Sequence, residues 1–247
     1  MTVRLVVADT SKPTGKVLEA TLKEMGVSVS QAGKAVISYG VRLQTSQPCL
    51  NANAGVGDKF QQLQVLGKNG IKVPHSWTGG MPDKFPVLAR KRKHHGGTDI
   101  KIVLQPEEVA WRRASGSDYF LEFLPIRSEY RIWIYRGAHL ATYSKEMKYP
   151  GKFKYIGRNY RNGFVFNLVK SEAVPRGAVE QASMSVLALD LDFGAVDILQ
   201  STNGGFYVLE VNTAPGVEGA ARQGIRALAQ KIARWEQKGY PNRRTET

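Results

Sequence analysis

Two strand-like stretches near the C-terminal end of the chain flank a tight turn, and this pattern constrains the fold more than any other part of the sequence. The stretches cover residues 193–199 and 206–211, and the dipeptide Asn203-Gly204 between them is a strong β-hairpin signal. A hairpin centred on this dipeptide places Asp197 directly opposite Glu210 on the neighbouring strand. We therefore predict that both carboxylates lie on one face of an antiparallel sheet.

Opposed carboxylates destabilise a sheet unless a cation neutralises them, and Asn212 adds a third oxygen donor to this pair. Asn212 is two residues beyond Glu210 and so shares its face. Because carboxylate and carbonyl oxygens favour hard ions, we predict that Asp197, Glu210 and Asn212 bind Mg²⁺, with Mn²⁺ as the alternative ion. The other interpretation is a solvated hairpin whose carboxylates pair with Lys or Arg side chains. The opposite face is apolar and should pack against a helix; it carries Val196, Ile198, Leu209 and Val211.

Strand-like and helix-like patterns alternate along the whole chain, which indicates a mixed α/β (α+β) fold with substantial antiparallel sheet. The first strand is expected at 3–8 and the second at 35–39, with a helix between them, and a loop at 44–57 marks a domain boundary. One helix should begin after Asp58, another at Pro175, and the last near the C-terminal end. Further strands are expected at 86–90, 100–104, 119–124, 130–135, 139–143 and 163–168.

The chain is strongly basic, because 35 Lys and Arg residues outnumber 21 Asp and Glu residues and give a formal net charge of +14. This excess favours an anionic partner, and nucleotides, acidic peptides and nucleic acids all meet that description. The basic residues are spread along the chain, so a solvated basic surface is at least as good an interpretation as a nucleic-acid-binding face.

The cysteine content and the hydropathy of the chain indicate its compartment. Cys49 is the single cysteine and cannot form a disulfide within the chain, which favours a reducing compartment. No apolar run approaches the ~18 residues that a membrane-spanning helix needs, and the first residues resemble a strand, not a signal peptide. We therefore predict a soluble cytoplasmic protein that does not associate with a membrane, while its oligomeric state stays open.

The acidic hairpin, taken with the residues that follow it, resembles a known family. Asp197, then Glu210-Val211-Asn212 and Thr213-Ala214-Pro215-Gly216, is similar to the metal-binding end of the ATP-grasp superfamily. The similar branch is that of carboxylate-amine ligases, which includes the enzyme that adds glutamate to a ribosomal protein tail. The resemblance extends over roughly residues 37–219.

This resemblance implies an ATP-grasp fold, in which two α+β lobes hold ATP between them. The small lobe, with a Gly-rich loop and a hinge, would cover residues 58–124. The large lobe, with the metal site, would cover residues 125–247, and a small Rossmann-like N-terminal domain would precede both lobes at 1–57.

The resemblance also implies which residues bind ATP. Lys59 lies where the family enters its nucleotide domain. The strand at 86–90 resembles one that ends in a phosphate-contacting Lys, so either Arg90 or Lys91 should contact the phosphates. The other implied contacts are Gly96 and Gly97 in the Gly-rich loop over the phosphates, Glu122, Phe123 and Leu124 on the hinge strand beside the adenine, Glu129 at the ribose hydroxyls, and Lys145 near the phosphates.

Three arginines complete the implied site. Arg131 would point into the reaction cleft, and Arg158 and Arg161 match the segment that holds the transferred phosphoryl group and the acid substrate. The implied enzyme is an ATP- and Mg²⁺-dependent ligase that joins a carboxylate to an amine through an acyl phosphate and releases ADP and phosphate. Its substrates would be amino acids or peptides, including acidic ones. Two alternatives stay open: a nucleic-acid-binding or nucleic-acid-modifying protein on the same scaffold, and a kinase of the superfamily.

Overall fold

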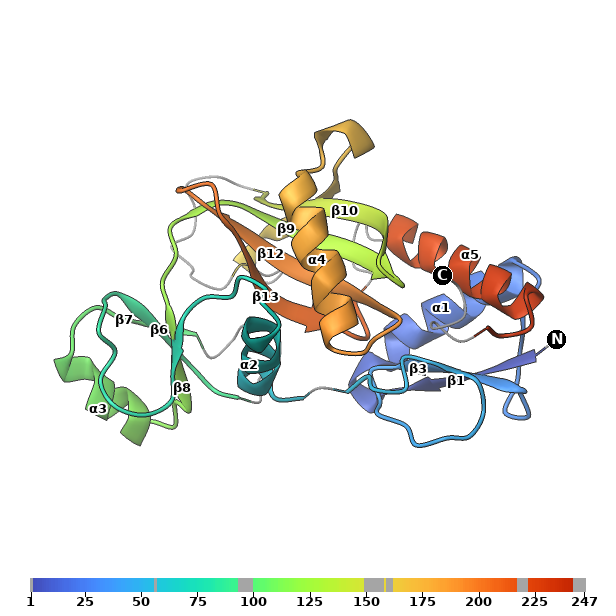
Figure 1. The fold of residues 1–247 in the computed structure, drawn as a ribbon, viewed down its shortest axis with the longest axis horizontal. Coiled ribbons are helices and arrows are strands. Elements are labelled where there is room, and N and C mark those ends of the chain that lie inside the picture. The colour runs from blue at the N-terminus through green and yellow to red at the C-terminus, as the bar shows by residue number, and fades with distance from the viewer. Residues whose placement is uncertain are drawn as a thin grey trace.

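The computed structural model of this chain describes residues 2–55, 57–92, 100–148, 158, 162–216 and 222–241. These residues form three β-sheets with helices packed on them (Figure 1). A five-stranded sheet lies in the middle of the molecule, a four-stranded sheet lies at one end, and the N-terminal four-stranded sheet lies at the other. None of the described helices combines the length and the apolar character that crossing a membrane requires.

The N-terminal sheet is parallel and has the strand order β2-β1-β3-β4. All five residues of β3 are buried, and α1 packs on the sheet through an apolar face that includes Leu18 and Leu22. The predicted loop at 44–57 contains β4, which is too short to leave a periodic signal. The Rossmann-like character of this segment stays a prediction. The elements are β1 (Thr2–Val7), a 3₁₀ turn (Asp9–Ser11), α1 (Lys12–Glu24), β2 (Ser28–Val29), β3 (Ala35–Tyr39) and β4 (Cys49–Leu50).

The second four-stranded sheet is antiparallel and has the order β5-β8-β6-β7. One face packs on α3 through Phe120 and Val109, and the other packs on α2 through Leu121 and Leu63. The sequence analysis did not predict α3, because Val109 is its one buried residue and gives no helical periodicity. The elements are α2 (Lys59–Lys68), β5 (Ser76–Trp77), β6 (Val87–Arg90), β7 (Lys101–Val103), α3 (Glu107–Ala114) and β8 (Tyr119–Glu122).

The five-stranded central sheet is antiparallel and has the order β11-β10-β9-β12-β13. Helix α4 lies across one face, where Ala182 and Val186 are fully buried (Figure 1). Helix α5 contacts α1 and comes so close to the sheet that a Cβ on Gly224 would lie 2.7 Å from Cδ2 of Trp133. The elements are β9 (Ile126–Tyr135), β10 (Ala138–Met147), β11 (Phe164–Leu168), a 3₁₀ turn (Ser171–Ala173), α4 (Arg176–Ala188), β12 (Phe193–Ser201), β13 (Phe206–Asn212) and α5 (Arg222–Gln237).

The three sheets fall within the ranges 1–57, 58–124 and 125–247, although the division into domains itself stays a prediction. One hydrophobic core joins the first and last of these ranges. It contains Leu18 and Ile37 from the N-terminal sheet and its helix, together with Trp133 and Ile232 from the central sheet and α5. The N-terminal sheet is therefore fixed to the sheet that carries the acidic hairpin.

The predicted hairpin forms, but a β-bulge changes part of its register. Asp197 pairs with Glu210 as expected, and the register then shifts so that Ile198 pairs with Val208. Leu209 is the extra residue, and its predicted place in the helix-facing core is wrong. Val208 fills that place against α4, and Leu209 points to the other side of the sheet, where it lines a cavity.

Candidate active site

A row of charged side chains crosses the central sheet at the level of the acidic pair. Arg131 on β9 pairs in register with Asp197 on β12, which pairs in turn with Glu210 on β13. The guanidinium of Arg131 donates from Nε to Oδ1 of Asp197 over 2.7 Å and from Nη2 to Oδ2 over 2.8 Å. Burial disfavours the charged guanidinium, but Asp197, with Glu210 and Glu129, outweighs it and raises the pKa of Arg131 above its ordinary value. Arg131 therefore stays charged at neutral pH.

Glu210 has two partners of its own. Lys59, the first residue of α2, donates from its ammonium group to Oε2, and Nδ2 of Asn212 donates to Oε1 over 3.1 Å. Burial opposes the ionisation of Glu210, but Lys59, Arg131 and Asn212 outweigh it and hold the pKa of this carboxyl well below its ordinary value. Each carboxylate thus pairs with a Lys or Arg side chain, as in the alternative interpretation, but Asp197 is buried and not solvated as that interpretation required.

A second charged group lies around Glu129, two residues before Arg131 on β9. Glu129 is buried, accepts from the ammonium of Lys145 on β10, and has Nε of Arg158 3.9 Å from its Oε2. Burial raises the pKa of Glu129, and Lys145 and Arg158 oppose that shift. The structure thus places Lys145, which was predicted near the phosphates, against the predicted ribose ligand.

The donor set of the acidic hairpin fits Mg²⁺. Asp197 and Glu210 lie opposite each other, and because Asn212 donates from its amide nitrogen to Glu210, its amide oxygen is available to a cation. Among the described residues, no cluster of three or more His, Cys, Asp and Glu side chains makes a complete metal site. A set of two carboxylates and one amide suits Mg²⁺, which usually keeps waters and substrate phosphates in its coordination shell.

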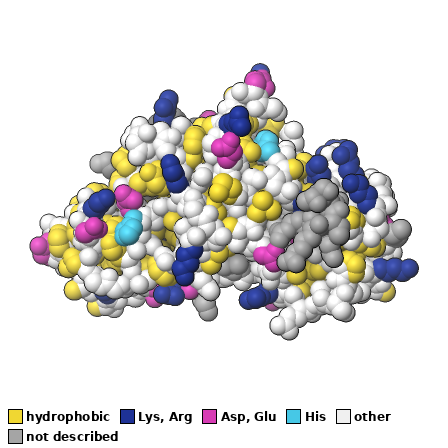
Figure 2. All heavy atoms as spheres, viewed as in Figure 1, with side chains coloured by type: hydrophobic (Ala, Val, Ile, Leu, Met, Phe, Trp, Pro, Cys, Tyr) yellow, Lys and Arg dark blue, Asp and Glu magenta, His cyan; other side chains and the backbone are white. Residues whose placement is uncertain are grey.

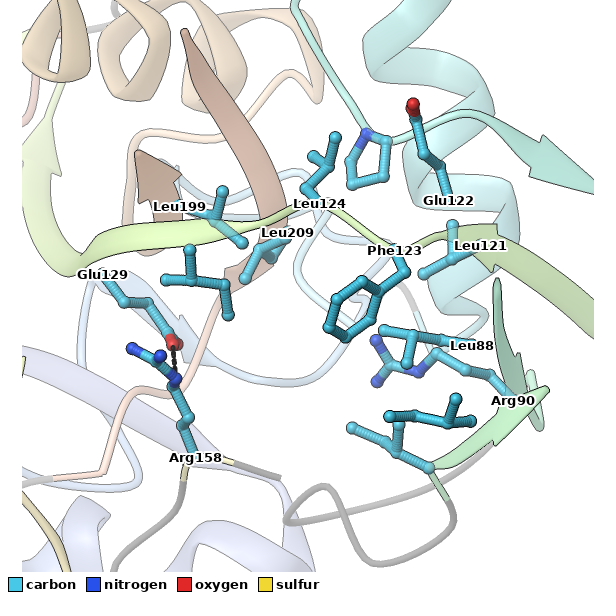
Figure 3. Close-up of a pocket in the computed structure, with 14 residues that line it drawn as sticks. Leu88, Arg90, Leu121, Glu122, Phe123, Leu124, Glu129, Arg158, Leu199 and Leu209 are labelled. Atoms are coloured by element: carbon cyan, nitrogen blue, oxygen red, sulfur yellow. Dashed lines mark ion pairs between the residues drawn. The ribbon is translucent and has the colours of Figure 1, made fainter. Parts of the chain in front are cut away.

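A cavity of about 350 Å³ lies between the small antiparallel sheet and the central sheet. It is lined by apolar side chains from both sheets, and Phe123 and Leu124 connect the sheets beside it (Figure 3). Glu129 and Arg158 lie at one side of the cavity (Figure 3). Its size and lining suit a flat apolar ring with polar groups at one side. The apolar lining residues are Leu88, Ile100, Ile102, Leu121, Ile126, Leu199 and Leu209, with Pro74.

The predicted phosphate and adenine contacts divide between the cavity and the surface. Arg90 lines the cavity and extends into it, whereas Lys91 is exposed and does not line it (Figure 3). The carboxylate of Glu122 points away from Leu88 and Arg90 and accepts from the backbone N–H of His75 over 3.4 Å (Figure 3). Gly96, Gly97 and Arg161 lie outside the described residues.

The sequence analysis did not single out the apolar lining. Leu88, Leu121 and Leu199 follow the alternation of ordinary buried strands, so their pattern does not separate cavity lining from core. Leu209 also lines the cavity, because the bulge in β13 turns it to that side of the sheet, and a leucine at this position does not predict a bulge. Leu199 and Leu209 lie within two residues of Asp197 and Glu210 along the chain, and this closeness is the sequence feature that could have identified them as cavity-lining residues.

No family model matches the chain, but relatives in sequence and in structure do. A probable alpha-L-glutamate ligase of Shewanella loihica is 27% identical, with 94% of this chain and 83% of the relative covered. The one of Marinobacter nauticus is 24% identical over 93% of this chain and 82% of the relative.

Solved structures define the fold. The D-alanine–D-alanine ligase of Bacillus anthracis complexed with ATP matches with a TM-score of 0.69 at 15% identity, covering 97% of this chain and 98% of that one. The ATP-grasp ligase PsnB, complexed with a minimal precursor, matches with a TM-score of 0.70 at 11% identity, covering 95% and 99%. The macrocyclase MdnC of Microcystis aeruginosa, bound to its precursor peptide, has a TM-score of 0.64 at 14% identity, covering 95% and 100%. The predicted ATP-grasp fold is confirmed.

Proposed function

We propose that this chain, which has the ATP-grasp fold, is an ATP- and Mg²⁺-dependent ligase that joins a carboxylate to an amine. The observation that carries the proposal is the pairing of Asp197 with Glu210 next to an apolar cavity between two sheets. Leu199 and Leu209 line that cavity and lie within two residues of the acids along their strands. The cavity therefore suits the apolar ring of a nucleotide, and the neighbouring acidic pair, with a bound cation, suits its charged phosphate chain.

The roles of the nucleotide-binding residues follow from their surroundings. The adenine would lie among the leucines of the cavity beside Phe123 and Leu124, with the ribose toward Glu129. Of the two candidates for the phosphate contact, Arg90 is favoured over Lys91, because Arg90 lines the cavity and Lys91 is exposed. Lys59 would contact the phosphates from the start of α2. The remaining predicted contacts, Gly96, Gly97, Glu122 and Lys145, stay predictions.

Asp197, Glu210 and Asn212 would hold the divalent cation, which supplies positive charge to neutralise the triphosphate. In the first step a carboxylate oxygen of the acid attacks the γ-phosphorus, and the bond from that phosphorus to the bridging oxygen of ADP breaks. The amine then attacks the acyl carbon, the bond to phosphate breaks, and the nitrogen loses a proton to solvent. Both partners in the first step are anions, so Arg131, Arg158 and Arg161 would offset their repulsion.

ADP release tests this reaction directly. With ATP and Mg²⁺ present, we expect ADP to form at least about tenfold faster with acid and amine together than with either alone, because a closed site protects the intermediate from water. A screen of pooled amino acids and peptides, with mass spectrometry of the products, would identify the pair. ADP release that needs no amine would indicate a kinase instead, and AMP as the product would contradict the proposal.

The comparisons support amino acids or peptides as substrates. The relatives in sequence are named as glutamate ligases, and PsnB and MdnC are described with precursor peptides. The alternative of a nucleic-acid-binding protein has less support. On the face shown in Figure 2, the described Lys and Arg side chains are scattered among other residues and do not form one broad basic area.

The net charge of +14 supports an acidic acceptor such as a peptide tail. We expect kcat/KM for acidic peptides to fall severalfold when salt is raised from about 50 mM to about 300 mM, because added salt screens exposed charges. Neutral peptides of equal length serve as the control and should change little. Equal salt dependence for acidic and neutral peptides would argue against this acceptor class.

A further inference from the structure

Gln62 on α2 bonds the backbone of the strand that carries Glu210 and Asn212. Its side chain is buried; Oε1 accepts from the backbone N–H of Val211 over 2.8 Å, and Nε2 donates to the carbonyl of Val211 over 3.0 Å. Because β13 is the last strand in the order of the central sheet, its outer edge has no strand beside it in the described part of the chain. The amide of Gln62 therefore takes the place of a neighbouring strand at Val211.

The two hydrogen bonds hold the peptide units on either side of Val211, between two predicted metal ligands. The N–H of Val211 belongs to the peptide unit that follows Glu210, and its carbonyl belongs to the one that precedes Asn212. Peptide units are planar, so holding both of them fixes the backbone from which both side chains project. Val211 itself packs on the α4 side of the sheet, and its two neighbours therefore point to the opposite side.

The bulge in β13 makes this contact necessary for the alignment of the acids. The outer edge of β13 is also bonded at Val208, whose N–H donates to the carbonyl of Lys72 over 2.8 Å. That bond lies before Leu209, the extra residue of the bulge, and so does not fix the strand beyond it. Gln62 bonds the outer edge on the other side of the bulge, where the predicted metal ligands lie.

Helix α2 brings a second side chain to the same place. Lys59 and Gln62 are three residues apart and so lie on one face of the helix. Lys59 donates to the carboxylate of Glu210, while Gln62 bonds the next residue along the strand. Leu63, which follows Gln62, packs instead on the small sheet (Figure 1). One helix thus connects the small sheet to the strand that carries the acidic residue.

We propose that Gln62 is a positioning residue for the cation site, which holds Glu210 and Asn212 in the orientation that binds the divalent cation. This role rests on the proposed function, because it takes the acidic hairpin as the cation site. Gln62 does not itself bind the cation, since its amide is used by Val211. Residues that orient metal ligands in this way commonly change metal affinity by about ten- to 100-fold.

The test is Gln62→Met, which keeps the length of the side chain and removes both hydrogen bonds. Mn²⁺ is the probe, and electron paramagnetic resonance measures its affinity for the protein saturated with ADP. We expect the Kd for Mn²⁺ to rise about tenfold or more, because the two ligands are no longer held in place. The Mg²⁺ concentration that gives half-maximal ADP release should rise by a similar factor. The affinity for adenosine should stay the same, since Gln62 does not line the cavity.

Two further variants separate positioning from stability. Gln64→Met is the matched control, because Gln64 lies on the same helix and donates to the hydroxyl of Ser76 over 3.0 Å at the surface. It should keep the wild-type affinity for Mn²⁺. Gln62→Met leaves two buried backbone groups without partners and should lower Tm, whereas the shorter side chain of Gln62→Ala leaves room for water to bond them. Gln62→Ala should show the same loss of Mn²⁺ affinity well below its Tm.

Unchanged Mn²⁺ affinity in folded Gln62→Met or Gln62→Ala would overturn this role, whatever the change in Tm. An equal loss of affinity in Gln64→Met would also overturn it, and failure of both Gln62 variants to fold would assign Gln62 to stability alone. Glu210→Gln separates this role from the proposed function. If the wild-type protein binds Mn²⁺ no better than Glu210→Gln does, the proposed cation site fails and the role of Gln62 fails with it. If Glu210→Gln loses Mn²⁺ affinity and the Gln62 variants do not, this role alone fails.

Discussion

Replacing Glu210 with Gln is expected to lower kcat for ADP release by about 10³-fold or more, because it removes one of the two carboxylate charges that would hold the cation. Gln has nearly the same shape as Glu and keeps an oxygen that accepts from Lys59. The variant removes the charge and keeps the size of the side chain, although its single amide oxygen cannot accept from both Lys59 and Asn212 as the carboxylate does. ATP binding should weaken less than turnover, since the apolar cavity is intact.

Glu210 is a cleaner target than Asp197. Asp197→Asn would leave the buried guanidinium of Arg131 with only part of its bidentate partner, and an uncompensated buried charge destabilises a protein by about 3–5 kcal/mol. A loss of activity in that variant could then result either from the missing carboxylate or from unfolding of the protein. Glu210 is about one-fifth exposed, and Lys59 can turn toward solvent when its partner is neutral.

The measurement is steady-state ADP release over a range of Mg²⁺ concentrations, with Tm as a check on folding. Glu146→Gln is the matched control, because Glu146 lies on β10 of the same sheet, where it accepts from Ser144 and Asn167. It should retain wild-type turnover. Turnover of Glu210→Gln within about tenfold of wild type would contradict a cation-binding role for this hairpin.

Local signals predict the hairpin, because they mark its two strands and its tight turn. They do not by themselves set the pairing of Asp197 with Glu210: the pairs beside the turn, Leu199 with Tyr207 and Ile198 with Val208, lie one position out of the predicted register, and the bulge brings the two acids opposite each other. The bulge that moves Leu209 into the cavity could not be predicted in this way. Leucine is common both in cores and in cavity linings, so the residue type of Leu209 does not show that it is the extra, unpaired residue of the bulge.

The partners of the acidic residues were harder to predict, because they come from distant parts of the chain. Lys59 meets Glu210 across 151 positions, and nothing near either residue indicates this contact. Arg131 and Asp197 are 66 positions apart and meet because β9 and β12 are neighbours in the sheet order. Strand order depends on packing of the whole domain, which local patterns do not determine.

Asn51 should be the most sensitive position for stability among the contacts between the N-terminal sheet and the central sheet. Its side chain is fully buried; Oδ1 accepts from the backbone N–H groups of Asp192 and Phe193 over 2.7 and 2.8 Å, and Nδ2 donates to the carbonyl of Phe193 over 2.8 Å. Asn51→Ala would leave the buried N–H and carbonyl of Phe193 and the partly buried N–H of Asp192 without these partners. It would also place Ala at a φ of +59°, a conformation that non-glycine residues rarely adopt.

We expect Asn51→Ala to lower the free energy of unfolding by about 4 kcal/mol or more, most of it from the unsatisfied backbone groups. Chemical denaturation measures this loss. Asn51→Gly separates the two contributions, because Gly adopts the same φ without strain, so the remaining loss belongs to the hydrogen bonds.

Asn53→Ala is the matched control for Asn51→Ala, since Asn53 lies two residues further on and donates to Asp190 at the surface over 2.7 Å. It should cost less than about 1 kcal/mol. Asn51 anchors Phe193, the first residue of the strand that carries Asp197, so its loss should also lower turnover by disturbing the acidic pair. Equal stability of the Asn51→Ala and Asn53→Ala variants would mean that the shared apolar core, and not this network of hydrogen bonds, fixes the two sheets to each other.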